Sequence, residues 1–204
     1  MVSILVLSNI FFWKFNSTTR LVYHLRNICK IRNFISFKAC ETLIHAFISW
    51  KLDFCNSLFY GQSKSSIRKL QLLQNAAARV LTQTNRYEHI SPILCNLNWL
   101  PVEQRIQFKI SLFTFKILNN SAPAPLSDLV QLYKPTRSLR SSSKNLLCVP
   151  SFNLNSYGKR AFSCAAPRLW NSLPKDVQSA TSVSSFKSLL KTWLCQLAYS
   201  DFLH

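Results

Sequence analysis

Apolar residues recur every three or four positions along most of this chain, which is the period of a helix with one buried face. Five segments show this period, namely 17–31, 37–59, 64–82, 102–119 and 183–197. Shorter helices are expected within 86–100, near 126–133 and just before Pro174. The pattern therefore predicts a mainly α fold, an irregular helical bundle.

One segment departs from the helical period. Residues 134–151 are basic, rich in serine and turn-forming. A pairing of about 137–141 with 146–149 predicts a small β-hairpin near 137–149. The chain then divides into a helical part, residues 16–133, and a basic C-terminal region, residues 134–204, which holds the hairpin and the last helix.

The segment 37–59 predicts one long helix that ends before Gly61, a residue suited to the position after a helix end. On a helical wheel its apolar side chains share one face, which is expected to be buried. They are Cys40, Leu43, Ile44, Phe47, Trp50 and Phe54.

The segment 64–82 predicts a helix that is capped by Ser63 and has a polar face opposite its apolar face. The polar face consists of Lys64, Arg68, Gln71, Asn75 and Arg79. No acidic residue interrupts it, whereas a solvated face usually mixes both signs of charge. Such a face suits phosphate groups.

The segment 102–119 has two apolar faces, so it is expected to be the central helix of the bundle. Pro101 stands near its start, where the missing N–H is harmless. Arg105, Lys109 and Lys116 line up between the two apolar faces. We expect this basic strip to emerge through a cleft between the neighbouring helices.

The charge balance indicates a polyanionic partner. The 204 residues include 25 Lys+Arg and 7 Asp+Glu, for a net charge of +18. Nucleic acid is the usual partner of such an excess, and an anionic membrane surface is the second candidate. A membrane-spanning helix is not predicted, because the apolar stretch 2–13 is shorter than the about 20 residues that crossing requires.

Catalytic chemistry is not predicted. The seven carboxylates are scattered singly, without the Asp-Asp or Asp-x-Asp pair that would help to hold two metal ions. On a helix the pairs His24/Cys29 and Cys40/His45 would diverge by about 140°, so no zinc site is expected. We expect no catalytic residue, no metal, no cofactor and no small-molecule substrate.

The seven cysteines lack a short regular spacing and stand mostly at apolar helical positions. They predict reduced, buried thiols in an intracellular protein of the nucleus or cytoplasm.

Basic and aromatic residues alternate between Tyr133 and Trp170. The basic ones are Arg137, Arg140, Lys144, Lys159, Arg160 and Arg168. These side chains can hold phosphates. Phe162 and Trp170 are expected in the core, because large aromatic side chains are usually buried.

Five blocks of sequence occur in a familiar order. They are KLDFCNSLFYG (51–61), LQLLQNAAARVLT (70–82), NWLPVEQRIQFKISLFTF (98–115), SLRSSS (138–143) and YGKRAFSCAAPRLWNSLP (157–174). Together they resemble the C-terminal region of LINE-type (non-LTR) retrotransposon reverse transcriptases, including jockey-like elements. The resemblance covers about residues 17–198, with departures at Phe54, Asn98 and Ala124, and residues 1–15 do not match.

The resemblance implies a thumb-like helical bundle over residues 16–133, following a polymerase palm whose Asp-Asp motif lies upstream in that family. The chain would then be a non-catalytic fragment that grips RNA or an RNA/DNA primer-template. The alternative is a degenerate retroelement relic with no physiological activity. The nucleic-acid-binding residues expected are Lys64, Arg68, Asn75, Arg79, Arg105, Lys109, Lys116, Arg137, Arg140, Lys144, Lys159 and Arg160.

Overall fold

The computed structural model describes residues 19–133, 146–152 and 158–200, and it confirms a mainly α architecture. Residues 19–31 form the first helix. The following elements are η1 (Arg32–Phe34), α2 (Phe37–Ile44), η2 (His45–Ser49), α3 (Trp50–Asp53), η3 (Asn56–Phe59), α4 (Lys64–Thr82), α5 (Ile90–Asn96), α6 (Val102–Leu118), α7 (Ala124–Ser127), α9 (Phe162–Ser172), α10 (Lys175–Gln178) and α11 (Val183–Tyr199).

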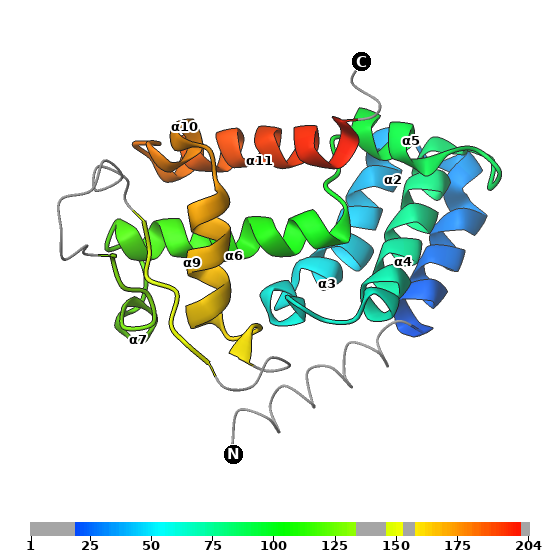
Figure 1. Cartoon of the computed structure of the whole chain (residues 1–204). Coiled ribbons are helices and arrows are strands. Elements are labelled where there is room, and N and C mark those ends of the chain that lie inside the picture. The colour runs from blue at the N-terminus through cyan, green and yellow to red at the C-terminus, as the bar shows by residue number, and fades with distance from the viewer. Residues whose placement is uncertain (1–18, 134–145, 153–157, 201–204) are drawn as a thin grey trace.

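Helix α6 lies at the centre, as its two apolar faces predict. It contacts α11, α9, η3 and α4. In Figure 1, α11 runs along one side of α6 and α9 crosses it, while α2 and α4 stand together at its N-terminal end. Apolar residues of the first predicted region and of the C-terminal region belong to one buried cluster. The predicted boundary near 133 stays a prediction.

The core of the C-terminal half is aromatic. Phe115 of α6 stacks on Phe186 of α11 with ring centroids 4.2 Å apart, and Trp170 of α9 lies 6.1 Å from Phe186. Trp170 is buried and Phe162 is partly buried against the same cluster, in agreement with the prediction for both rings. These three helices are therefore joined by rings from each of them.

Serine hydroxyls define the starts of three helices. The Oγ atoms of Ser36, Ser63 and Ser182 accept hydrogen bonds from the backbone N–H groups of residues three positions later. Each bond satisfies one of the amides that have no partner within the helix. The predicted bounds of α4 are confirmed, and α11 extends two residues past the predicted end.

The segment 37–59 is not one α-helix, and its predicted buried face is wrong beyond Ile44. The chain forms a π-helix over His45–Ser49, in which the Trp50 N–H bonds to the His45 carbonyl five residues back. This wider turn keeps Ile44, Ile48 and Leu52, each four residues apart, on the buried side. As a result Phe47, Trp50 and Phe54 are exposed by 41 %, 58 % and 42 %.

Two further predictions need correction. The helix expected near 126–133 is one turn at Ala124–Ser127, after which Leu132 makes an antiparallel bridge with Leu147. Residues 131–133 thus pair with residues 146–148. The Tyr133 N–H donates to the Leu146 carbonyl, and the Cys148 N–H donates to the Gln131 carbonyl. The predicted pairing with 137–141 lies outside the described residues.

The cysteines are all free, and the prediction of buried thiols is confirmed for Cys40 and Cys164. Cys55, Cys95 and Cys195 are partly buried, whereas Cys29 and Cys148 are exposed, so the prediction is wrong for these last two. Burial raises the pKa of the Cys40 thiol. None of the described helices is both long and apolar enough to cross a bilayer.

Candidate nucleic-acid interface

A groove of about 660 Å³ opens where α4, α5, the start of α6 and the end of α11 meet. Helix α4 forms one wall with Lys64, Arg68 and Asn75. Lys159, together with Arg168 of α9, contributes from the C-terminal region. Segments more than 90 residues apart in the sequence therefore face one cavity.

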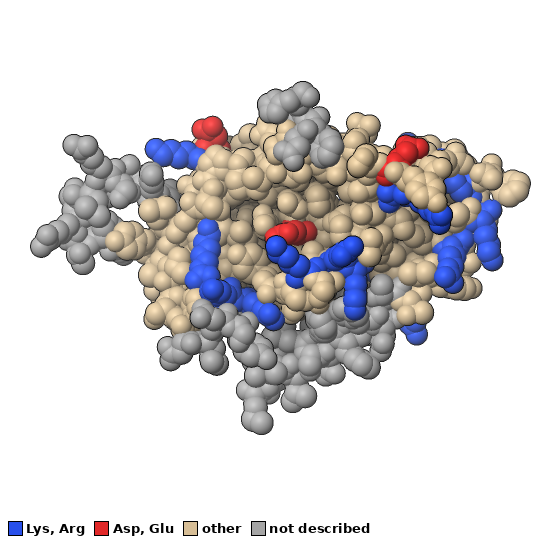
Figure 2. Space-filling model, turned by 45° about the vertical axis from the view of Figure 1, so that its right-hand side comes forward, with Lys and Arg blue, Asp and Glu red and all other residues tan. Residues whose placement is uncertain are grey.

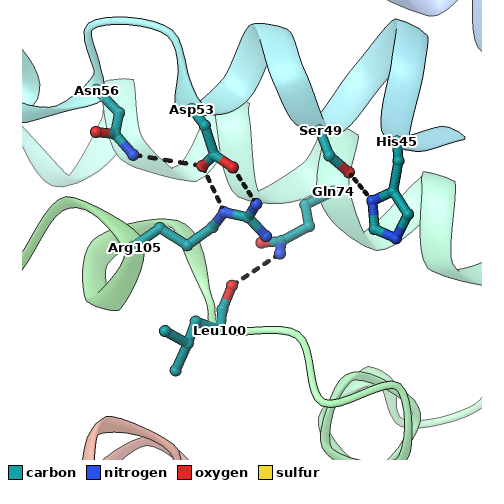
Figure 3. Close-up of polar contacts among 7 residues, drawn as sticks. All are labelled: His45, Ser49, Asp53, Asn56, Gln74, Leu100 and Arg105. Atoms are coloured by element: carbon teal, nitrogen blue, oxygen red, sulfur yellow. Dashed lines mark hydrogen bonds and ion pairs between the residues drawn. The ribbon is translucent and has the colours of Figure 1, made fainter. Parts of the chain in front are cut away.

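The corner between α4 and α6 is fixed by two glutamines of α4. The Gln71 Oε1 atom accepts the Val102 N–H at 2.8 Å, which caps the start of α6. Gln74 is fully buried, and its Nε2 donates to the Leu100 carbonyl at 2.8 Å (Figure 3). Gln71 was predicted to lie on the polar face that suits phosphates, but it acts as a structural residue that positions the groove wall. Its Nε2 also donates to Asn75 Oδ1 at 2.8 Å.

The groove combines an apolar floor with a polar rim. The apolar side chains include Ile67 of α4, Leu94 of α5 and Ile106 of α6. Carboxamide side chains lie among them. They belong to Gln62, Gln71, Asn75, Gln104 and Gln107.

The charge of the groove is positive. Its described lining residues include four cations, Lys64, Arg68, Lys159 and Arg168, and one carboxylate, Glu103. None of the four forms an ion pair within the part of the chain that the structure describes. Figure 2 shows Lys and Arg side chains on both sides of a central hollow that contains a single visible acidic patch. Such an arrangement attracts an anionic ligand.

Tyr60 and Gly61 form the edge of the groove beside the C-terminal region. Burial is the largest cause of a raised pKa at Tyr60, although the nearby Arg168 charge lowers that pKa. The phenol therefore stays protonated and can donate a hydrogen bond. Gly61 has φ +69°, and a Cβ there would lie 2.9 Å from Cγ of Arg160, so the glycine allows Arg160 to pack against the groove edge.

Of the predicted binding residues, Lys64, Arg68, Asn75 and Lys159 line this groove. Arg160 stands at its edge, against Gly61. Arg137, Arg140 and Lys144 lie outside the described residues.

Arg79 does not line the groove. Its Nη2 donates to the Glu88 carbonyl at 2.9 Å, and its Nε donates to the Asn85 carbonyl at 3.4 Å. This guanidinium holds the loop after α4 against the helix.

The basic strip predicted on α6 does not form a free surface. Arg105 turns toward the N-terminal half, and its Nε and Nη2 reach the two carboxylate oxygens of Asp53 at 2.8 and 2.5 Å (Figure 3). The Arg105 side chain is only 19 % exposed, so a charge there needs a partner. Lys109 is half-buried with its Nζ 5.5 Å from the Phe113 ring centroid, and Lys116 is half-buried outside the groove.

The groove residues that were not among the predicted binding residues include Tyr60, Glu103 and Arg168. Arg168 belongs to the basic cluster seen in the sequence and lies 5.0 Å over the Phe152 ring. Glu103 and Tyr60 had no local signal, because only the folded chain brings them beside α4. Their blocks, 51–61 and 98–115, are nevertheless two of those that carry the family resemblance.

The described residues do not bring three His, Cys, Asp or Glu side chains together as a metal site would require. His24 instead stacks on Phe47 with centroids 5.1 Å apart. His45 bonds to Ser49 Oγ at 3.1 Å.

No protein-family model, curated protein or solved structure matches this chain.

Proposed function

We propose that this chain binds nucleic acid through the groove between α4 and α6, as the non-catalytic, thumb-like C-terminal region of a LINE-type reverse transcriptase. The observation that carries the proposal is the meeting of Lys64, Arg68, Lys159 and Arg168 around one cavity without ion-pair partners in the described residues. A chain of net charge +18 has few carboxylates to neutralise these side chains internally. Phosphates would neutralise them.

The family resemblance supports the same site. Block 70–82 supplies Gln71 and Asn75, block 98–115 supplies Glu103 and its neighbours, and block 157–174 supplies Lys159 and Arg168. A family that grips RNA or an RNA/DNA primer-template with this region would need such a surface. The catalytic carboxylates would belong to another part of that polymerase.

The test compares two exposed arginines on helices. Arg68→Glu changes the groove, and Arg26→Glu makes the same charge change on the helix over residues 19–31. We expect Arg68→Glu to weaken binding of a labelled RNA at least tenfold and to flatten the dependence of log K on log salt by about 0.7 to 1.4, since one or two phosphate contacts disappear. Arg26→Glu is expected to change the affinity less than threefold.

Fluorescence anisotropy between 50 and 300 mM salt measures both quantities. Equal losses in the two variants would mean that net charge alone drives binding, and the groove would be ruled out as the site. Thermal unfolding tests the alternative of a relic, because a chain without a cooperative transition forms no groove.

A further inference from the structure

We propose that the groove takes unpaired nucleotides with a base inside it, and that Glu103 accepts a hydrogen bond from the amino group of a cytosine. This inference rests on the proposed function and specifies its ligand as a single strand. The groove offers three kinds of contact, a cationic rim, an apolar floor and a lone carboxylate, and each constrains the ligand differently.

The apolar floor argues against a ligand that presents only its sugar-phosphate backbone. Ile67, Leu94 and Ile106 provide no hydrogen-bond donors, and phosphates placed over them would lose water without compensation. The flat face of a base is apolar and can cover such side chains. A duplex keeps its bases stacked inside, whereas a single strand can turn them outward into a protein pocket.

The cavity has a volume suited to this ligand. At about 660 Å³ it lies within the range of small-molecule sites, roughly 300 to 1,000 Å³. The rim then holds the flanking phosphates, with Lys64 and Arg68 on α4 and with Lys159 and Arg168 on the C-terminal side. The neutral carboxamides of Asn75, Gln104 and Gln107 also line the cavity and can offer hydrogen bonds to the edge of a base.

Glu103 is the feature that a phosphate-only surface does not explain. A carboxylate among four cations repels phosphates, and it forms no ion pair among the described residues. Its position in the first turn of α6 favours the helix, but this role does not require it to face the cavity. Carboxylates accept hydrogen bonds from the cytosine N4 amino group. Uracil has a carbonyl oxygen at that place, which a carboxylate repels.

The experiment uses the full chain and three labelled RNAs. They are an eight-residue oligocytidylate, an eight-residue oligouridylate, and a hairpin of four base pairs that is closed by a non-nucleotide linker and has about the same net charge. Two variants, Glu103→Ala and Glu103→Gln, both remove one negative charge. Only the glutamine keeps an oxygen that can accept the amino proton. Anisotropy gives each affinity, and thermal unfolding checks that both variants fold.

We expect the unmodified chain to bind oligocytidylate at least fivefold more tightly than oligouridylate, and the hairpin more weakly than either. Both variants should bind oligouridylate more tightly than the unmodified chain, because a repulsive charge is gone. Glu103→Ala should reduce the preference for cytosine to below twofold, and Glu103→Gln should keep part of it.

Equal affinity for the hairpin, the absence of a cytosine preference in the unmodified chain, or a preference that Glu103→Ala leaves unchanged would overturn this inference and leave nucleic-acid binding by the groove intact. Loss of salt-dependent binding to all three RNAs would instead overturn the proposed function, and the inference with it.

Discussion

Helices α4 and α6 each carry a row of basic residues, but the structure uses the two rows in opposite ways. On α4, Lys64 and Arg68 line a groove and form no ion pair among the described residues. On α6, Arg105 is inserted between neighbouring elements and pairs with Asp53. Neither row itself contains an acidic residue, so the sign of charge along the row does not separate them.

The difference follows from the number of packed faces. Helix α4 packs one face and leaves the other to solvent, which hydrates a cation at little energetic cost. Helix α6 is surrounded by α9, α11, α4 and η3, so a cation between them loses water and requires a fixed carboxylate. A basic row stays accessible to a ligand only when its helix has a free side.

The strongest test of this comparison removes the carboxylate. Asp53→Ala leaves the Arg105 guanidinium largely desolvated and unpaired, and we expect it to reduce the free energy of unfolding by about 2 kcal/mol. This value lies between those for buried and exposed pairs because the Asp53 side chain is 42 % exposed. Chemical denaturation measures the loss.

The matched control replaces both partners. The double variant Asp53→Leu, Arg105→Met should recover most of the free energy of unfolding that Asp53→Ala loses, because no charge then remains buried. It should also bind RNA within twofold of the unmodified chain. A tenfold weaker affinity would show that Arg105 belongs to the binding surface after all.

A smaller loss of stability is expected at Tyr199 of α11, which also lines the groove. The buried Tyr199 hydroxyl donates to the Trp99 carbonyl at 2.5 Å, so Tyr199→Phe should reduce stability by about 1 to 2 kcal/mol at pH 7. Burial raises the pKa of Tyr199 above its usual range. In the unfolded chain the phenol ionises near pH 10, while the folded chain keeps its proton, so the unmodified protein loses stability above about pH 10.

The phenylalanine variant lacks this alkaline loss. The stability difference between the two proteins should therefore narrow from pH 8 to pH 11, as denaturant titrations at both values can measure. A constant difference would mean that Tyr199 does not keep its proton in the folded state.

The smallest effect separates two arginines of α4. Arg79→Met removes the hydrogen bonds to the Asn85 and Glu88 carbonyls and should reduce stability by about 0.5 to 1 kcal/mol, with RNA affinity within twofold. Arg68→Met is its control, with the reverse outcome of weaker RNA binding and unchanged stability. Thermal melts and anisotropy on the same samples measure both. Similar behaviour of the two variants would remove the distinction made within α4.

Local sequence signals predicted the helices well where they agreed with one another. Ser63 and a regular apolar period specified α4, and two apolar faces specified the central place of α6. The π-helix after Ile44 has no comparable signal, because the apolar residues fit an α-helical wheel with Phe47 and Trp50 inside. Packing of Ile48 and Leu52 against the core favours the wider turn instead.

Only part of the candidate site could be predicted from the sequence. The cationic face of α4 is a property of one helix and could be found from spacing. The pairing of Arg105 with Asp53 joins residues 52 positions apart, so spacing along one helix does not reveal it. Tyr60, Glu103 and Arg168 likewise come together from three separate segments. The basic strip of α6 was expected to emerge through a cleft, and the apolar faces on both sides of Arg105 are the signal that points to its burial instead. A buried cation then needs one of only seven carboxylates.

The two glutamine bonds at the turn before α6 have a consequence for how a strand would be captured. Gln71 bonds to residue 102 and Gln74 bonds to residue 100, and both belong to α4, so these two hydrogen bonds hold the α4 wall against the start of α6. The groove therefore has its shape before an RNA strand binds, and little ordering of the protein opposes association. The amides at this turn should therefore exchange with deuterium equally slowly in the free and in the RNA-bound protein.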